Sequence, residues 1–281
     1  MQDALNQATR IWLPKDNNVK GIIVIAHGYG EHSGRYQHVA DYFVQQGYAI
    51  YAADHRGHGR NRGTKLGYFD RFDLLYDDLK RVIARAREEQ RGPLFLLGHS
   101  VGGLLALYYA IKNQSTLNGL IVSAPYVRSN AEIPAPMQMV ARFLSRVAPR
   151  LGIVPPPDVS TLSKDPQVVK DYETDPDVLH TQVTARVGVE LVEAGDTVRA
   201  NLGKITLPIL ILHGSLDRLA NPKYAQDVYD GVSSPDKTIK IYEGLYHEIL
   251  NEPEKARVLA DIWVWMAAHQ GTGELRAPAH S

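Results

Sequence analysis

The sequence predicts an α/β fold with a doubly wound, mostly parallel sheet and a helical insertion. Short apolar runs typical of buried strands alternate with segments of helical periodicity along most of the 281 residues, which is the pattern of a parallel sheet covered by helices. The alternation stops after residue 125 and resumes after residue 202. We therefore expect a core formed by residues 1–125 and 203–281, with a cap inserted at residues 126–202.

The core elements are predicted from apolar runs of strand length and from helical spacing. Gly21-Ile-Ile-Val-Ile-Ala26 is continuously apolar, as a strand buried on both faces requires. Between residues 72 and 88, apolar positions recur at helical spacing with charge on the opposite side. In chain order we expect strands at residues 9–14, 21–26, 48–53, 94–97, 120–124, 207–212 and 238–242, helices at residues 33–44 with Ser33 as N-cap, 72–88, from 104 onward, 222–230 and 253–269, and a frayed tail from residue 271.

The predicted cap is rich in proline and holds two segments of amphipathic helical spacing, residues 136–148 and 176–194. In the first segment Met139 and Phe143 widen an apolar face, and arginines recur every four residues, at Arg142, Arg146 and Arg150. One interpretation is a helix packed on the core with a solvated arginine edge. The other is a lid that docks transiently on a membrane or micelle surface with its apolar face down.

Composition and charge restrict the classes of partner and chemistry. The formal net charge of +0 gives no general attraction to nucleic acid or to anionic membranes. The absence of cysteine excludes disulfides, thiol nucleophiles and cysteine-bound zinc, and fits a reducing compartment. The first twenty residues contain Asp3 and lack the apolar run of a secretory leader, and eighteen apolar residues never follow one another. We expect a soluble, cytoplasmic protein without a nucleic-acid partner.

The segment Gly98-His-Ser-Val-Gly102 lies between a predicted strand and a predicted helix. Gly-x-Ser-x-Gly in this context is the signature of a nucleophile presented on a sharp turn. The flanking positions need residues without side chains, because strand and helix nearly touch there, and Gly98 and Gly102 meet that need. We predict that Ser100 is a nucleophile. The alternative is an ordinary glycine turn.

A serine nucleophile needs a base, and the base needs an orienting carboxylate. Asp217 follows the predicted strand 207–212, and His247 follows the predicted strand 238–242. Both are therefore expected at the carboxyl edge of the sheet that also carries Ser100. The chain order Ser, acid, His is the one this hydrolase topology uses. Considered singly, Asp217 and His247 have the alternative interpretations of a loop-capping aspartate and a turn histidine.

Attack on an ester develops an oxyanion that requires two preorganised donors. We expect the backbone N–H groups of Val101, at the start of a helix, and of Tyr29, in the loop after the strand 21–26. The alternative is that Gly28 and Gly30 in that loop only make a tight turn.

Two further patterns near this loop suggest other chemistry. Gly28-x-Gly30-x-x-x-Gly34, with Asp54 after the next strand, imitates a dinucleotide fingerprint, but its spacing is one residue too long. Asp54, His55 and His58 are conceivable metal ligands. A glycine-rich loop with turn-bonded side chains explains them more simply. We predict that neither a cofactor nor a metal is required.

Several segments of the chain resemble the sequence blocks of monoacylglycerol lipases. The resemblance spans about residues 22–265 and implies an α/β-hydrolase fold with a helical cap. It further implies hydrolysis of monoacylglycerol by the triad Ser100, Asp217 and His247, while residues 126–164 of the cap depart most from the pattern. The segments are His27-Gly-Tyr-Gly-Glu-His-Ser-Gly-Arg-Tyr36, Asp54-His-Arg-Gly-His-Gly59, Gly98-His-Ser-Val-Gly-Gly103, Ser215-Leu-Asp-Arg218 and Asp236-Lys-Thr-Ile-Lys-Ile-Tyr-Glu-Gly-Leu-Tyr-His247.

The substrate-binding residues are predicted at two ends of one pocket. The resemblance implies that the glycerol head contacts Glu31, Arg35, His99 and Tyr172. The alternative is that Glu31 and Arg35 pair on the surface and Tyr172 packs a loop. An apolar tunnel is expected for the acyl chain, with walls from Val178, Leu179, Val183, Val187, Leu191 and Val192.

The predicted activity is cleavage of a small lipid ester through an acyl-enzyme. Two other functions remain open. One is a broader carboxylesterase or lysophospholipase, since the triad does not distinguish leaving groups. The other is a non-catalytic receptor with a hydrolase fold, which keeps the pocket but usually lacks a complete triad.

Overall fold

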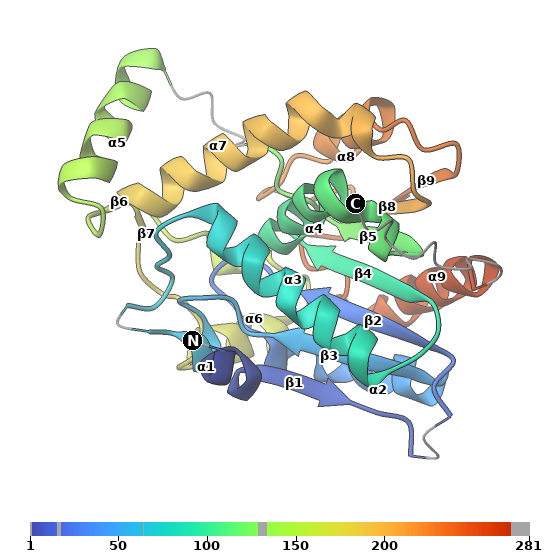
Figure 1. Cartoon of the computed structure of the whole chain (residues 1–281). Coiled ribbons are helices and arrows are strands. Elements are labelled where there is room, and N and C mark those ends of the chain that lie inside the picture. The colour runs from blue at the N-terminus through green and yellow to red at the C-terminus, as the bar shows by residue number, and fades with distance from the viewer. Residues whose placement is uncertain (1, 16–17, 64, 129–133, 271–281) are drawn as a thin grey trace, which may run out of the picture.

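A seven-stranded sheet forms the centre of the computed structural model, which describes residues 2–15, 18–63, 65–128 and 134–270. The strand order is β1-β3-β2-β4-β5-β8-β9, and every neighbouring pair is parallel except β1 with β3. The predicted fold class is confirmed (Figure 1). The strands are β1 (Thr9–Trp12), β2 (Gly21–Ala26), β3 (Tyr48–Ala53), β4 (Leu94–His99), β5 (Gly119–Ser123), β8 (Ile209–Gly214) and β9 (Lys237–Tyr242).

Helices cover both faces of this sheet, and the strand side chains alternate between them. On β2, Ile22 and Val24 face the cluster that contains helices α3 (Phe72–Glu89) and α4 (Val101–Asn113), while Ile23 and Ile25 face α2 (Gln37–Gln45) and α9 (Lys255–Ala268). Every residue of β2 is buried. This explains its continuously apolar sequence, because a strand covered on both sides has no solvated face.

Between β5 and β8 the chain forms α5 (Ala135–Val147), β6 (Gly152–Val154), α6 (Pro166–Thr174), β7 (Val183–Thr184) and α7 (Ala185–Asn201), and β8 is followed by α8 (Lys223–Gly231). The prediction of a helix at residues 176–194 is wrong in its bounds, because α7 begins at Ala185 and α6 precedes it. The sequence contains a signal for the start of α6, an aspartate followed by a proline. The Asp165 side chain accepts from the Gln167 N–H as an N-cap, and Pro166 occupies the first turn.

The predicted N-cap Ser33 is a second correction. The His32 side chain caps the 3₁₀ turn η1 (Ser33–Tyr36), and α2 begins only at Gln37. Ser33 is drawn away from the helix because its backbone N–H and its hydroxyl both donate to the buried carboxylate of Asp54. Helix α1 (Gln2–Gln7) was not predicted, and β1 ends at Trp12.

None of the helices in the described ranges combines the length and the apolar character that a membrane span needs. The predicted tail from residue 271 lies outside the described residues.

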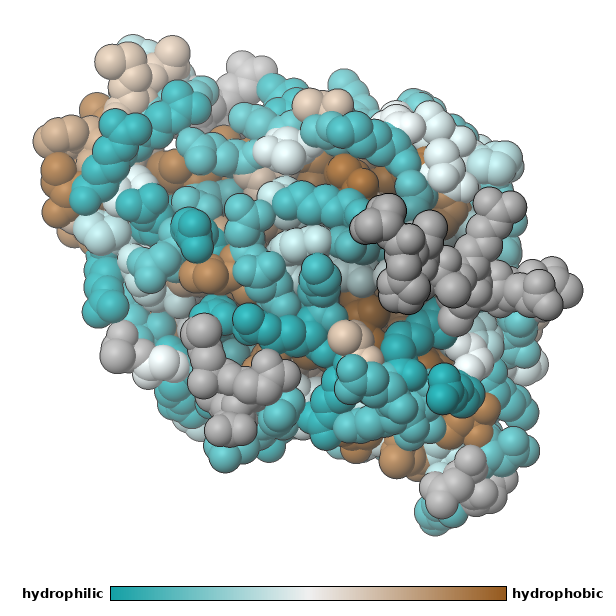
Figure 2. All heavy atoms as spheres, viewed as in Figure 1, coloured by the Kyte–Doolittle hydropathy of each residue, from teal (hydrophilic) through white to brown (hydrophobic). Residues whose placement is uncertain are grey.

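Helix α5, at the upper left of Figure 1, lies apart from the sheet and packs against α7. The exposed apolar side chains of α5 gather at this end of the molecule, where Figure 2 shows a brown patch.

Candidate active site

Ser100 occupies a strained turn between β4 and α4. Its backbone has φ 53° and ψ −117°, a left-handed conformation that side chains rarely adopt. Hydrogen bonds on both sides of the residue hold this conformation: its N–H donates to the Ser123 carbonyl at 2.9 Å, and its carbonyl accepts from the N–H groups of Leu104 and Tyr126, each at 3.0 Å. The turn thus places Ser100 at the carboxyl edge of the sheet.

The two glycines that flank Ser100 are required by close backbone approaches. A Cβ atom on Gly98 would lie 2.2 Å from the Gly102 carbonyl oxygen, and one on Gly102 would lie 2.0 Å from the Ala26 carbonyl oxygen. Since real Cβ atoms do not approach so closely, neither position accepts a side chain unless β2, β4 or α4 moves. The steric reason for Gly-x-Ser-x-Gly that the sequence indicated is therefore present.

Asp217 and His247 are joined by a hydrogen bond in the loops that follow β8 and β9. The His247 Nδ1–H donates to Asp217 Oδ2 at 2.7 Å, and the other carboxylate oxygen accepts from the backbone N–H groups of Leu219 at 2.8 Å and Ala220 at 2.9 Å. Both side chains are buried. The carboxylate orientation is consequently fixed by backbone as well as by side chain.

Burial and charge act in opposition on this pair. Burial disfavours the Asp217 carboxylate, yet His247 and His213 lower its pKa well below the usual range. Burial likewise disfavours the imidazolium of His247, but the neighbouring Asp217 carboxylate outweighs it and raises the pKa. Asp217 therefore stays ionised and His247 is a stronger base than a solvated histidine.

His213, at the end of β8, is a residue of this site that sequence reasoning missed. Its Nε2 lies 2.9 Å from Asp217 Oδ2 and 2.9 Å from the Ala220 carbonyl oxygen. The available signal was a histidine in an otherwise apolar strand, four residues before the predicted acid.

The loop after β2 is held by two buried histidines. His27 Nδ1–H donates to the Gly28 carbonyl at 2.7 Å, and His27 Nε2 accepts from the His55 N–H at 2.9 Å. The His55 Nε2–H donates to the His27 carbonyl at 2.9 Å. Burial, with the charge of His58 adding to it, lowers the pKa of His27 to about 3, so its ring is neutral and this pattern of donors persists.

The alternative metal ligands Asp54, His55 and His58 are directed at other partners. Asp54 accepts from Arg10 at 3.1 Å, and one ring nitrogen of each histidine, His55 Nε2 and His58 Nδ1, donates to a backbone carbonyl. Within the described ranges, no three histidine, aspartate or glutamate side chains converge as metal ligands do.

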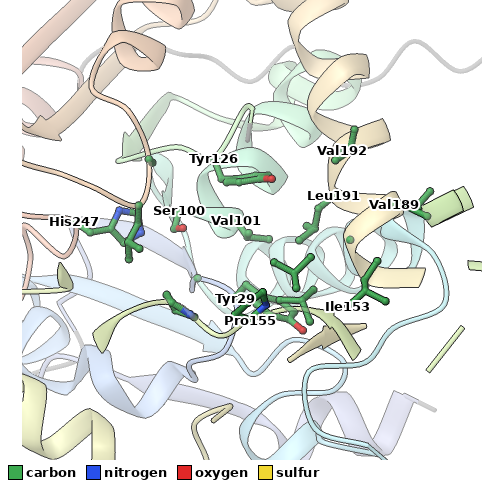
Figure 3. Close-up of a pocket in the computed structure, with 18 of the residues that line it drawn as sticks. Tyr29, Ser100, Val101, Tyr126, Ile153, Pro155, Val189, Leu191, Val192 and His247 are labelled. Carbon is green, nitrogen blue, oxygen red and sulfur yellow. The ribbon is translucent and has the colours of Figure 1, made fainter. Parts of the chain in front are cut away.

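A cavity of about 700 Å³ opens at Ser100. Ser100 and His247 lie at one end of it, and Ile153, Val189 and Val192 lie at the other (Figure 3). Its walls come largely from the segment between β5 and β8. Its apolar lining includes Met137, Val140, Ala141, Leu144, Ile153, Val154, Pro155, Val183, Val189, Leu191 and Val192.

The predicted tunnel wall is therefore right for half of its residues. Val183, Leu191 and Val192 line the cavity. Val178, Leu179 and Val187 do not: Val178 packs with Leu162 and Tyr172, Leu179 lies against Gly67, and Val187 belongs to the core beneath α7.

Two of the predicted head-group residues, Glu31 and Arg35, belong to a buried ion cluster beside the cavity. The Arg35 guanidinium binds Glu248 through two nitrogens, at 2.7 Å each, and Glu31 at 2.9 Å. It also lies over the ring of Tyr172, 4.8 Å from the ring centre. Glu31, His99, Tyr172 and Glu248 line the cavity. The alternative of a surface pair is wrong, because the side chains of Arg35 and Glu31 are only 10% and 4% exposed.

Glu248, next to the predicted base, is the second residue that sequence reasoning missed. Burial opposes its ionisation, but Arg35 lowers its pKa to about 2. For Glu31 burial dominates and raises the pKa, although Arg35 acts against it. Glu31 also accepts from the Gly28 N–H at 2.6 Å and the Tyr36 hydroxyl at 2.8 Å, so this cluster and the loop after β2 are one hydrogen-bonded unit.

A serine on a strained strand-to-helix turn, with an aspartate–histidine pair after the last two strands of a parallel sheet, defines an α/β-hydrolase of the serine hydrolase class. Comparisons with known proteins agree. The family model described as serine aminopeptidase, S33, matches residues 17–254. A monoacylglycerol lipase of Mycolicibacterium smegmatis is 36% identical over 92% of each chain.

Other relatives point the same way. The monoglyceride lipase of Homo sapiens is 34% identical over 96% of this chain and 89% of its own. The crystal structure of Paleococcus ferrophilus monoacylglycerol lipase superposes with a TM-score of 0.81 at 28% identity, covering 93% of this chain and 98% of that one. The chain belongs to the monoacylglycerol lipase family of α/β-hydrolases.

The close approach at the turn predicts the effect of a single methyl group. Gly102→Ala should reduce the free energy of unfolding by more than about 3 kcal/mol, because the added Cβ collides with backbone that has no space to move into. Gly188→Ala is the matched control: apart from the adjoining backbone of α7, no atom lies within 4 Å of its added Cβ, and alanine favours the helix. Thermal unfolding checks both. An unchanged melting temperature for Gly102→Ala would contradict the steric account.

The ion cluster predicts a pH-dependent cost for losing its arginine. Arg35→Met should destabilise the fold by about 3 kcal/mol at pH 8, because two buried carboxylates lose their counter-charge. The depressed pKa of Glu248 contributes stability above its ordinary value near ~4.3 that is lost as the pH falls toward 2. The variant lacks this contribution at both pH values. In the variant burial favours the protonated forms of Glu31 and Glu248, and protonation at the lower pH relieves the cost of burying their charges. The loss of stability relative to the parent should therefore be smaller at pH 5 than at pH 8.

Urea unfolding at the two pH values measures this difference. Lys164→Met is the control, since its ion pair with Glu254 is largely solvated and should cost less than about 1 kcal/mol at either pH. An Arg35→Met deficit that is equal at both pH values would contradict the assignment of buried, ionised carboxylates.

Proposed function

We propose that this protein hydrolyses monoacylglycerol to glycerol and a fatty acid through an acyl-enzyme on Ser100. The observation that carries the proposal is the position of Ser100 and the Asp217–His247 pair at one end of an apolar cavity of about 700 Å³. A cavity with one apolar arm and a polar end suits a molecule with one acyl chain and a small diol head.

In the proposed mechanism the His247 Nε2 removes the hydroxyl proton as Ser100 Oγ attacks the ester carbonyl carbon. The proton then passes to the glycerol oxygen as the carbon–oxygen bond breaks, which leaves the acyl group on Ser100. His247 next takes a proton from water, whose oxygen attacks the acyl carbon, and returns it to Ser100 as the fatty acid departs. Asp217 holds the tautomer with hydrogen on Nδ1 throughout.

The proposed oxyanion donors are the backbone N–H groups of Val101 and Tyr29. Val101 is the first residue of α4, where helical N–H groups are unpaired. For Tyr29, the support comes from His27, whose Nδ1–H holds the Gly28 carbonyl at 2.7 Å. In a trans peptide the next N–H points opposite to that carbonyl, so the Tyr29 N–H is turned away from His27.

The glycerol head is proposed to bind at Glu31, Arg35, His99 and Tyr172. Glu31, His99 and Tyr172 line the cavity. Arg35 does not line it, but it contacts Glu31 and the ring of Tyr172 and so orients both side chains. Burial, with the charge of His247 adding to it, lowers the pKa of His99 to about 3. His99 therefore offers a neutral ring to the head group.

Docking of α5 on lipid is the second part of the proposal. Met139 and Phe143 are 69% and 63% exposed, and Ser145 is the buried residue of this helix. The same helix lines the cavity through Met137, Val140 and Leu144. A helix that presents apolar side chains to water beside the cavity is suited to an interface, where these side chains enter the acyl region.

The nucleophile is tested by Ser100→Ala, which should reduce kcat by at least about 10³-fold while the fold is retained, because only the attacking oxygen is removed. The variant should also lose labelling by a fluorophosphonate probe. Ser160→Ala, on the exposed turn η4 (Val159–Thr161), is the control and should behave as the parent. Turnover of monooleoylglycerol by Ser100→Ala at the parent rate would exclude this mechanism.

The head-group assignment is tested by Tyr172→Phe on two esters. Loss of a hydrogen bond should cost about 1 kcal/mol, several-fold in kcat/KM, on monooleoylglycerol. A nitrophenyl ester of similar chain length lacks the diol and should be hydrolysed at nearly the parent rate. Equal losses on both esters, or trioleoylglycerol cleaved as fast as monooleoylglycerol, would favour a general esterase or lipase.

Lipid docking is tested by sedimentation with phosphatidylcholine vesicles. The double variant Met139→Asp and Phe143→Asp should bind vesicles more weakly than the parent, because charged side chains resist insertion. Trp263→Asp with Val264→Asp, on exposed positions of α9, is the matched control and should bind as the parent does. Equal sedimentation of the α5 variant and the parent would remove the docking proposal.

A further inference from the structure

We propose that His213 is a positioning residue for the acid of the triad, holding the Asp217 oxygen that faces His247 and limiting how strongly that oxygen attracts the His247 proton. The inference rests on the Ser100–Asp217–His247 mechanism proposed above. His213 is a second imidazole bonded to Asp217, besides His247, and it is not itself a member of the triad.

The hydrogen-bond pattern identifies which nitrogen of His213 carries the proton. Nε2 lies 2.9 Å from Asp217 Oδ2 and 2.9 Å from the Ala220 carbonyl oxygen. Both of these atoms only accept hydrogen bonds, so Nε2 must be the donor. The other nitrogen, Nδ1, is buried without a hydrogen-bond partner in the described part of the chain. Because an orphan nitrogen is costly, packing alone would favour an apolar side chain at this position.

The Asp217 carboxylate has four lone-pair positions, and the structure supplies four N–H donors. Leu219 and Ala220 donate to Oδ1, while His247 and His213 donate to Oδ2. With His213 in place, the charge of Oδ2 is shared between two imidazole N–H groups. Without it, that charge acts on His247 alone, because the Asp217 side chain has no exposure to solvent. The removal of His213 therefore strengthens the attraction of the carboxylate for the imidazolium.

The direction of the effect on His247 follows. Asp217 already raises the pKa of His247 against burial. Loss of the His213 hydrogen bond raises it further, so a larger fraction of His247 is protonated at neutral pH and cannot accept the Ser100 proton. The acid limb of the activity should move to higher pH.

The other ionisable groups around His247 do not interfere with measuring the acid limb of the pH profile. The ring of His99, on β4, lies 4.8 Å from the His247 ring, and burial lowers the pKa of His99 to about 3. Glu248 is adjacent in the chain and is paired with Arg35, with a pKa of about 2. Glu31, from the loop after β2, binds the same arginine, and burial raises its pKa. Glu31 is present in every variant compared.

The test is the rate of Ser100 labelling by a fluorophosphonate, measured from pH 5 to 9 in the full-length protein. His213→Gln carries an amide N–H close to the position of Nε2, whereas His213→Asn carries one close to Nδ1 and cannot reach Asp217. We expect His213→Asn to raise the midpoint of the acid limb by roughly 0.5–1 pH unit and to slow labelling at pH 7 by at most about threefold to tenfold. His213→Gln should restore both toward the parent values.

A matched control separates this effect from a general loss of stability. His38→Leu removes a histidine whose Nε2 lies 2.7 Å from the Leu250 carbonyl, and not one that bonds to Asp217 or Ser100, and should leave the midpoint unchanged. If His213 only fastens the loop through Ala220, the two His213 variants will lower the melting temperature without moving the midpoint, which overturns the inference. Equal midpoints for His213→Asn and His213→Gln overturn it as well. Failure of the parent to label at Ser100 would instead reject the proposed mechanism itself.

Discussion

The geometry of the candidate active site depends on one steric constraint: the backbones of β2, β4 and α4 pack so closely that no side chain fits between them. The Ala26 carbonyl lies where a Gly102 side chain would be, and the Gly102 carbonyl lies where a Gly98 side chain would be. This closeness forces the chain through a left-handed residue at Ser100. It also brings the loop after β2 beside Ser100, so that one contact positions the proposed nucleophile and the proposed oxyanion donors together.

Two systems of buried charge meet in the loop after β9. His247 binds Asp217 from the loop after β8, and the next residue, Glu248, binds Arg35 from the loop after β2. Each charge has a partner of opposite sign, and Asp217 and Glu31 also accept from backbone N–H groups. This is the condition under which ionised groups persist away from water. The consequence is a rigid, polar end to the cavity, in which the protonation states of the carboxylate, the imidazole and the neutral histidines are set by neighbours rather than by solvent.

The two halves of the segment between β5 and β8 are attached differently. Residues around α6 are tied to the loop after β2: the Leu179 N–H donates to the Gly30 carbonyl at 2.8 Å, and His32 Nε2 lies 2.8 Å from Asp175. Helix α5 instead packs on α7 and leaves most of its side chains in contact with water. The polar end of the cavity therefore belongs to the rigid body of the fold, while one apolar wall is built from a weakly embedded helix.

The sequence by itself determined the sheet, the turn at Ser100 and the order of Ser100, Asp217 and His247, because periodicity and glycine sterics act between residues close in the chain. Only the tertiary structure decided the partners of the buried charges. Arg35 and Glu248 are 213 residues apart, and nothing local in either segment indicates their pairing. The same holds for Val187 and Val192, both apolar and both on α7, of which one enters the core and the other the cavity. Such choices depend on which elements pack together in space, and local sequence does not encode that packing.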